Sequence, residues 1–351
     1  MKLAYILTLN IKIDIIKENI FIFGVEHDVR KEIYAMKHIF VVNPAAGKGK
    51  NLPAMLSAIT YACEELEVKY EIYHTKTIGD GTKFVSEKCK AFPNTKMRFY
   101  ACGGDGTLFE VLNGAVGYDN AEITVIPAGT GNDFIKTFQN PEYFSDVKRQ
   151  ILGIAEQMDL LKYNNKYSLN IVNIGFDCDV VQKVSEIKRK SLVPSKLAYI
   201  MGIADTFTKP LGKNFKVLID DNELIEKDFM LCAMANALYY GNGFKAAPLA
   251  KVNDGYMDLC LVDRVSRSKF IKIISKYKAG LHVDENRNSK YPFLRYQKCK
   301  KVVIESKEII GVCGDGEISP IRKVVIEIVP KAISFSIPKG SVCNALQDKN
   351  S

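Results

Sequence analysis

The sequence lacks any long run of apolar residues. A helix needs about 20 consecutive apolar residues to span a bilayer. The longest candidate, Phe229 to Tyr240, is interrupted by Asn236 and is better explained as a buried strand. Any contact with a membrane is therefore expected from the surface of a globular protein.

Cysteine pairs of the CxxC type and histidines at metal-ligand spacing are also missing. The nine cysteines are scattered singly, several of them inside apolar runs, and the four histidines are unpaired. This distribution argues against a disulfide framework or a zinc site. It predicts structural thiols in a reducing compartment, and hence a cytoplasmic protein.

Acidic residues are fewer than basic ones, with 40 Asp and Glu against 49 Lys and Arg, so the formal net charge is +9. A basic surplus fits an anionic membrane surface, a polyphosphate ligand or nucleic acid, and it also fits plain solubility. No groove-reading motif or aromatic-rich basic patch is present, so nucleic acid is not an expected partner.

A chain of 351 residues is about right for two domains. Residues 1–35 form an uncertain extension: an extra strand pair, a loose segment, or the product of an upstream start before Met36. In residues 36–160, strands alternate with helices, which predicts a parallel sheet covered on both faces. The expected strands are 39–42, 68–74, 97–102 and 123–126, and the expected helices are 52–66, 82–91 and 108–116.

Residues 161–329 are rich in strands and poor in helices, which predicts an antiparallel β-sandwich. The turn Asp220-Asp221-Asn222 indicates a hairpin. A return of residues 330–345 to the first domain also fits the pattern. The expected strands are 167–174, 215–219, 224–235, 256–262 and 301–304, with 324–329 and 334–337 separated by Pro330.

Three glycine-rich loops follow predicted strands of the first domain. Glycine lets backbone N–H groups approach phosphate oxygens, and a helix starting after the loop directs its positive end toward them. The loops are 43–49, 103–107 and 129–133, with the candidate nucleotide-binding residues Asn43, Gly47, Gly103, Gly104, Asp105, Gly106, Thr107, Gly129, Thr130, Gly131 and Asn132.

Each loop taken alone is equally well explained as a tight strand-to-helix turn. Three loops at successive strand ends favour a ligand site, because ligands of such sheets bind at the carboxyl ends of the strands. None of the loops matches GxxxxGK[ST], and no protein-kinase catalytic set is visible. Asp105 can hold Mg²⁺, which prefers oxygen ligands.

Several motifs resemble the diacylglycerol kinase catalytic-domain family, which includes bacterial soluble lipid kinases and sphingosine and ceramide kinases. They are "VVNPAAGKGK", "GGDGTLFEVLNG", "PAGTGNDF", "GNGFKAAPLAKVNDGYMDL" and "GDGE". The GGDGT motif alone is shared with NAD kinases and 6-phosphofructokinases. Phe109 departs from the family pattern, in which Asn is usual at this position.

The resemblance implies a fold with an α/β domain, like that of NAD kinases and 6-phosphofructokinases, and a β-sandwich, with ATP in the cleft between them. It also implies a structural Mg²⁺ beside the sandwich, held by the Asp254 carboxylate and the backbone carbonyls of Lys251 and Tyr256. A homodimer is implied as well.

The late motif Gly314-Asp315-Gly316-Glu317 supplies the candidate catalytic residues. In phosphoryl transfer to an alcohol the protein must accept one proton, and a carboxylate within hydrogen-bond reach of the acceptor oxygen can do so. The resemblance places Asp315 at the position of the catalytic base, with Glu317 as its partner. An ordinary Asp-Gly hairpin turn is the alternative.

Residues 183–209 combine a basic run, Lys188-Arg189-Lys190, with apolar residues at helical spacing after Pro194. Such a segment can lie on an anionic membrane, or it can simply be a helix packed on the sandwich. The sequence thus predicts an ATP- and Mg²⁺-dependent lipid kinase acting peripherally at the membrane, with diacylglycerol as acceptor. The alternatives are a kinase of a soluble alcohol or NAD, and a nucleotide- or lipid-binding module without catalysis.

Overall fold

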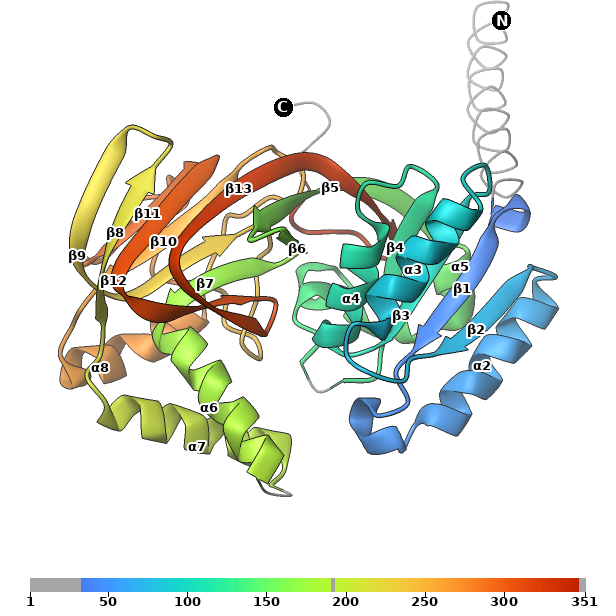
Figure 1. The fold of residues 1–351 in the computed structure, drawn as a ribbon, viewed down its shortest axis with the longest axis horizontal. Helices are drawn as coiled ribbons and strands as arrows, with labels where there is room; N and C mark the ends of the chain where they lie inside the picture. Colours follow the sequence, from blue (N-terminus) through green and yellow to red (C-terminus); the bar gives the residue numbers. More distant parts are fainter. Residues whose placement is uncertain (1–32, 130, 191–192, 347–351) are drawn as a thin grey trace, which may run out of the picture.

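The computed structural model describes residues 33–129, 131–190 and 193–346. The predicted combination of an N-terminal α/β domain and a C-terminal β-sandwich-like domain is confirmed (Figure 1). Most of the extension 1–35, together with Thr130, lies outside the described residues.

Four parallel strands form the centre of the first domain: β1 (Lys37–Val42), β2 (Tyr70–His74), β3 (Met97–Gly103) and β4 (Ala121–Pro127). They pair in the order β2-β1-β3-β4, so the three strands that precede the glycine loops are neighbours. Apolar side chains point to both faces of these strands, as expected for a sheet covered on both sides. Phe40 and Val42 face one core, whereas Ile39 and Val41 face the other.

Helices cover the two faces of this parallel sheet. On one face, α2 (Leu52–Glu65) and α5 (Val147–Ile151) bury Ile59, Ala62 and Ile151 against it. The opposite face packs against α3 (Asp80–Ala91) and α4 (Asp105–Ala115). Short 3-10 helices are η1 (Ala46–Gly49), η2 (Phe134–Thr137) and η3 (Pro141–Ser145).

The second domain is built from antiparallel strands around an apolar core. The predicted hairpin turn at Asp220 to Asn222 joins β8 to β9. Asp220 and Asp221 have positive φ angles of 48° and 55°, as two successive central residues of a tight hairpin turn often do. The strands are β5 (Ile154–Tyr163), β6 (Lys166–Ser168), β7 (Ile171–Gly175), β8 (Lys213–Ile219), β9 (Glu223–Ala235), β10 (Met257–Asp263), β11 (Leu294–Cys299), β12 (Lys301–Gly314) and β13 (Glu317–Ile337).

The prediction of two strands separated by Pro330 is wrong. One strand, β13, runs through this proline with a register shift between Val329 and Ile333, and Lys331 takes a φ of +51°. The end of β13 pairs in parallel with β4 through Ser334 and Phe335. Its earlier part pairs antiparallel with β12, and β5 pairs antiparallel with it from Ile326 to Ile337. The two domains therefore share one continuous sheet rather than holding two separate ones.

Three helices lie on one side of the second domain (Figure 1): α6 (Phe176–Lys190), α7 (Ser195–Thr208) and α8 (Arg267–Lys278). The helix after Pro194 was expected from the sequence, but α6 was not. No helix among the described residues is long and apolar enough to cross a membrane.

Candidate active site

The three glycine loops open into one large cleft between the domains. Its volume is about 1430 Å³. Since β1, β3 and β4 are adjacent and parallel, their carboxyl ends bring the loops together at one edge of the sheet. The cleft is lined by Asn43, Gly47, Gly104, Asp105, Gly106, Thr107, Gly129, Gly131, Asp315 and Glu317 among other residues.

The backbones of two of the loops are in contact, which explains why glycine occupies these positions. A Cβ atom on Gly129 would lie 2.6 Å from the Cα of Gly104. At Gly103 it would lie 2.1 Å from Oγ1 of the buried Thr107. At Gly47, whose φ is +57°, it would lie 2.8 Å from the carbonyl oxygen of Ala128. Side chains are thereby excluded where the loops meet.

Asp105 links the second loop to the third. Its carboxylate accepts hydrogen bonds from the backbone N–H groups of Asn132 (2.9 Å) and Asp133 (3.0 Å). Burial raises the pKa of Asp105 to about 6, and the negative charges of Asp133 and Asp315 act in the same direction. Gly131 must be glycine because a Cβ there would lie 2.4 Å from Oδ2 of Asp105.

The two asparagines among the predicted site residues also hold the loops. The Asn43 side chain donates to Oγ1 of Thr107 (3.3 Å) and accepts from the N–H of Ala45 (3.0 Å). Asn132 has a φ of +47° and donates to the carbonyl of Gly129 (3.1 Å). Both residues thus fix backbone turns beside the cleft.

Asp133 joins the third loop to the second domain. Its carboxylate accepts from the N–H groups of Asn242 (2.8 Å) and Gly243 (3.1 Å), which belong to the turn after β9. Lys136 forms an ion pair with the same carboxylate at 2.5 Å. This contact holds the first domain against the second at the edge of the cleft.

Asp315 enters the cleft from the turn between β12 and β13. Its φ is +46°, a left-handed conformation, and its carboxylate accepts from the N–H groups of Leu169 (2.8 Å), Asn170 (3.2 Å) and Ile171 (3.0 Å). Burial raises the pKa of Asp315 against the lowering effect of these hydrogen bonds. Glu317 lies on the nucleotide-loop side, with Oε1 3.9 Å from where a Cβ on Gly106 would be.

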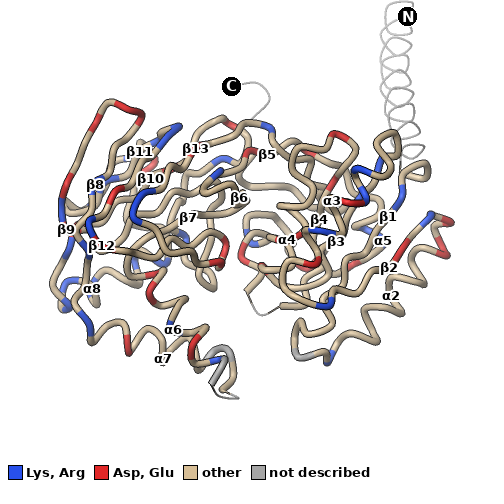
Figure 2. The backbone as a smooth tube through the Cα atoms, viewed as in Figure 1, with Lys and Arg blue, Asp and Glu red and all other residues tan. Residues whose placement is uncertain are grey.

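One face of α6 forms a further wall of the cleft. Asp177, Val181, Val184 and Lys188 line it at helical spacing, so a carboxylate stands at one end and an ammonium at the other. The side chains of Arg189 and Lys190 lie outside the described part of the chain. Figure 2 shows acidic segments on both sides of the junction between the domains, beside α4 and α6.

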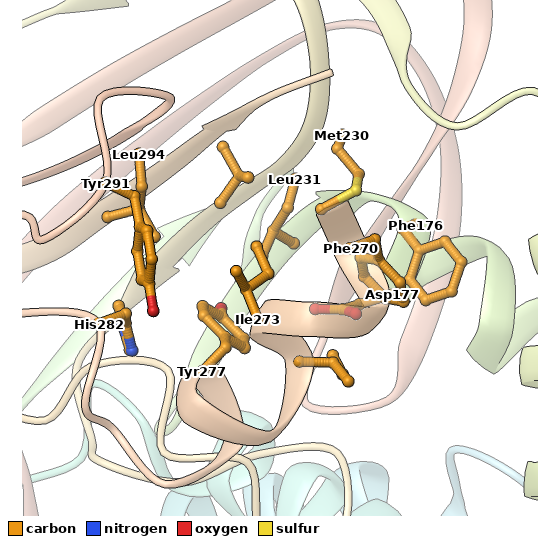
Figure 3. Close-up of a pocket in the computed structure, with 12 residues that line it drawn as sticks. Phe176, Asp177, Met230, Leu231, Phe270, Ile273, Tyr277, His282, Tyr291 and Leu294 are labelled. Atoms are coloured by element: carbon orange, nitrogen blue, oxygen red, sulfur yellow. The ribbon is translucent and has the colours of Figure 1, made fainter. Parts of the chain in front are cut away.

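Asp177 also faces a small apolar cavity of about 30 Å³ beneath α8 (Figure 3). Its carboxylate accepts a hydrogen bond from the Tyr240 hydroxyl. Burial raises the pKa of Asp177 to about 6, and the bond from Tyr240 opposes the shift. The remaining walls of the cavity are mainly apolar and aromatic and include Phe176, Leu231, Phe270, Tyr277 and Leu294.

The three predicted metal-binding residues lie in the segment that leads into β10, away from the residues that line the cleft. The Lys251 ammonium donates to the carbonyl of Leu346 (2.9 Å). Asp254 accepts from the N–H of Tyr256 (3.0 Å) and forms an ion pair with Lys298.

Sequence reasoning missed three site residues. Asp133 and Asp177 follow no spacing rule that would reveal their partners, because those partners lie 109 and 63 positions away. Glu110 follows the GGDGT motif and accepts from the N–H groups of Gly79 (2.8 Å) and Gly81 (2.9 Å), which fixes the start of α3. The family motif "GGDGTxNE" contains this glutamate and could have signalled it.

Comparison with known protein families identifies the family to which this architecture belongs. Residues 37–163 match the diacylglycerol kinase catalytic domain, and residues 170–337 match the YegS C-terminal NAD kinase beta sandwich-like domain. The two matches cover nearly all of the folded chain and make it a kinase-type enzyme. The protein belongs to the diacylglycerol kinase catalytic-domain family, as the sequence motifs predicted.

Individual relatives agree with this assignment. Proteins of Staphylococcus aureus strains Mu3 and MW2, each named "Putative lipid kinase", are 28% identical over 292 residues, covering 82% of this chain and 92% of theirs. A crystal structure of a "putative diacylglycerol kinase" from Bacillus anthracis is 25% identical with a TM-score of 0.65. It covers 86% of this chain and 98% of the other. A second structure from the same organism, 24% identical with a TM-score of 0.64, has the same fold.

Proposed function

We propose that this protein is an ATP-dependent lipid kinase that transfers the γ-phosphate of ATP to a lipid hydroxyl, with diacylglycerol as acceptor and phosphatidic acid as product. One observation carries the proposal. Three glycine-rich turns from adjacent strands and the Asp315 carboxylate line the same cleft, although Asp315 lies more than 180 residues further along the chain than the third turn.

The triphosphate is proposed to lie on the glycine turns. Backbone N–H groups and the N-terminus of α4 favour negative charge there. Asp105 or Glu317, which line the cleft, would supply an oxygen ligand to the Mg²⁺ bound with ATP. The cation would offset the phosphate charge, and it would also relieve the repulsion that Asp133 and Asp315 exert on Asp105.

The acceptor hydroxyl is proposed to lie beside Asp315. Its oxygen bonds to the γ-phosphorus, the bond from that phosphorus to the bridging oxygen of ADP breaks, and Asp315 takes the hydroxyl proton. Three backbone N–H groups fix the orientation of the Asp315 carboxylate. Its raised pKa makes it a better proton acceptor than a solvated aspartate.

The lipid is proposed to reach the cleft along α6 and from an anionic membrane surface. Val181 and Val184 supply an apolar wall for the part of the lipid next to the hydroxyl. On α7, Leu197, Ile200 and Met201 are 48%, 56% and 43% exposed, an apolar stripe at helical spacing. The lysines of α8 lie on the same side of the domain (Figures 1 and 2), which suits an anionic membrane.

The proposed chemistry is tested by Asp315→Asn together with Glu317→Gln. We expect Asp315→Asn to lower phosphorylation of diacylglycerol vesicles by 10²-fold or more, on the order of the general-base contribution, while ATP affinity measured by calorimetry changes less than threefold. Glu317→Gln, on the nucleotide side, should weaken MgATP binding as well. Glu308→Gln, an exposed carboxylate outside the cleft lining, is the control.

Three outcomes contradict this proposal. Full activity of the Asp315→Asn variant would show that Asp315 is not the catalytic base. Phosphorylation of NAD or a soluble alcohol in preference to lipid favours the soluble-substrate kinase. ATP binding without transfer to any acceptor favours a binding module.

A further inference from the structure

The segment leading into β10 places a carboxylate where water cannot solvate it. The Asp254 side chain is only 3% exposed, so its charge needs a partner within the protein. Its Oδ1 accepts the N–H of Tyr256 (3.0 Å). Its Oδ2 is paired with the Lys298 ammonium, which reaches it from β11.

Neighbouring groups surround this ion pair with positive charge. The ammonium groups of Lys298 and Lys300 lie over the ring of Tyr256, at 5.3 and 4.9 Å from its centroid. The buried Asp159 lies next to the segment, but its oxygens accept the N–H groups of Gly255 (2.6 Å) and Lys331 (2.8 Å). Both nearby carboxylates therefore already have donors.

These residues do not fit the structural Mg²⁺ that the family resemblance implies. Mg²⁺ takes a near-ideal octahedron of oxygen ligands at about 2.0–2.1 Å. Asp254 supplies the one carboxylate among the implied ligands, beside the backbone carbonyls of Lys251 and Tyr256, and the Lys298 ammonium already contacts its Oδ2. Within the described ranges, no group of three His, Cys, Asp or Glu side chains could hold a metal.

We propose that the Lys298 ammonium is the built-in cation of this segment, in place of a bound divalent metal. It neutralises Asp254 and, through the hydrogen bond from Tyr256 to Asp254, holds the turn that leads into β10. Asp258, Leu259 and Cys260 of β10 pair with β9 and β11 in the second domain. The fold of the second domain is therefore independent of Mg²⁺, whatever the nucleotide requires.

Thermal unfolding of the full chain without nucleotide tests this proposal. We expect the Tm of the wild-type protein to change by less than about 1 °C between 10 mM MgCl₂ and EDTA, because Lys298 already neutralises the Asp254 carboxylate. Lys298→Met should lower the Tm by about 3 °C or more in EDTA, since it leaves a buried carboxylate unpaired. MgCl₂ should restore part of that loss.

Lys300→Met is the matched control, because this lysine lies over the same ring but makes no ion pair with Asp254. It should show neither the loss nor the response to Mg²⁺. A wild-type Tm that rises by several degrees with Mg²⁺ would overturn the proposal, and so would a Lys298→Met variant that keeps the wild-type Tm in EDTA. The wild-type comparison is decisive even if Lys298→Met does not fold.

Discussion

At the scale of single residues, the contact between Gly104 and Gly129 decides how closely the nucleotide turns approach. Gly129→Ala should destabilise the fold by about 1–3 kcal/mol, because its Cβ would meet the Gly104 backbone at 2.6 Å. Gly104→Ala adds its Cβ at 3.4 Å from Gly129 and should cost much less. Urea unfolding of both variants measures the difference. Equal destabilisation would show that this contact does not limit the approach of the loops.

A second prediction at this scale concerns pH. The pKa values of Asp105 and Asp177 are both raised to about 6. The folded protein therefore binds these protons more tightly than the unfolded chain, whose aspartates titrate near about 4. The stability that they contribute is complete below about pH 4 and is lost as the pH rises through 6. Each group accounts for up to about 3 kcal/mol.

Asp177→Asn should remove part of this fall in stability, because the amide stays neutral and its oxygen can still accept from Tyr240. We expect the loss of unfolding free energy between pH 4.5 and 7.5 to shrink by about 2 kcal/mol in urea titrations. Asp105 and other buried aspartates with raised pKa values, among them Asp315, contribute to the pH dependence that remains. If the variant and the wild-type protein have the same pH dependence, Asp177 does not carry a raised pKa.

Single residues also show which features of the site could be predicted from the sequence and which could not. The glycines were predictable, because a loop that follows a strand and opens a helix favours them. The cleft is lined by Gly47, Gly104, Gly106, Gly129 and Gly131, whereas Gly103 is not in its lining. The hydrogen-bond partners of Asp133 and Asp315 were not predictable. Both carboxylates accept from backbone N–H groups of distant segments, and the sequence of a segment does not show which N–H groups will bind a carboxylate. The nucleotide, catalytic and metal roles assigned from the motifs stay predictions.

At the scale of elements, α7 presents the apolar stripe proposed to meet the membrane. Replacing Leu197, Ile200 and Met201 by glutamine should lower co-sedimentation with anionic vesicles at least tenfold, since apolar area buried in the interface drives such binding. Transfer to a short-chain lipid dispersed without vesicles should be retained. Leu224→Gln, 61% exposed on β9, is the control. Unchanged vesicle binding of the triple variant would exclude α7 as the docking surface.

The predicted elements were most reliable where hydrophobic periodicity was strong. The strands of the first domain and the helices that alternate with them lie close to the expected positions. By contrast, the sequence of α6 contains many charged residues, which obscured the helical spacing of its apolar ones. Proline usually ends a strand, but β13 continues through Pro330 because a change of register and the left-handed Lys331 absorb the interruption.

At the scale of the whole molecule, β13 belongs to both domains. It pairs with β12 and β5 over most of its length and with β4 near its end. The Thr124 hydroxyl donates to the carbonyl of Ser336 (2.9 Å), which adds a buried link. We expect one calorimetric unfolding transition for the full chain, because neither domain can lose this strand without exposing its core. Two separate transitions would contradict this coupling.

The homodimer implied by the family resemblance and the cytoplasmic, membrane-peripheral location stay predictions at this scale. The two-domain fold is confirmed by the matches to two family domains, whereas the predicted boundaries, 36–160 and 161–329, stay predictions. The continuity of the sheet was not predictable, since strand patterns alone do not say which strands pair across a domain boundary.

The most direct test of the central claim is incubation of the protein with γ-labelled ATP, Mg²⁺ and a panel of lipids in vesicles, alongside NAD and soluble alcohols. The account predicts label in a lipid that carries a free hydroxyl, diacylglycerol first, and no label in that lipid with Asp315→Asn. Label found only in a soluble acceptor, or in none, would contradict it.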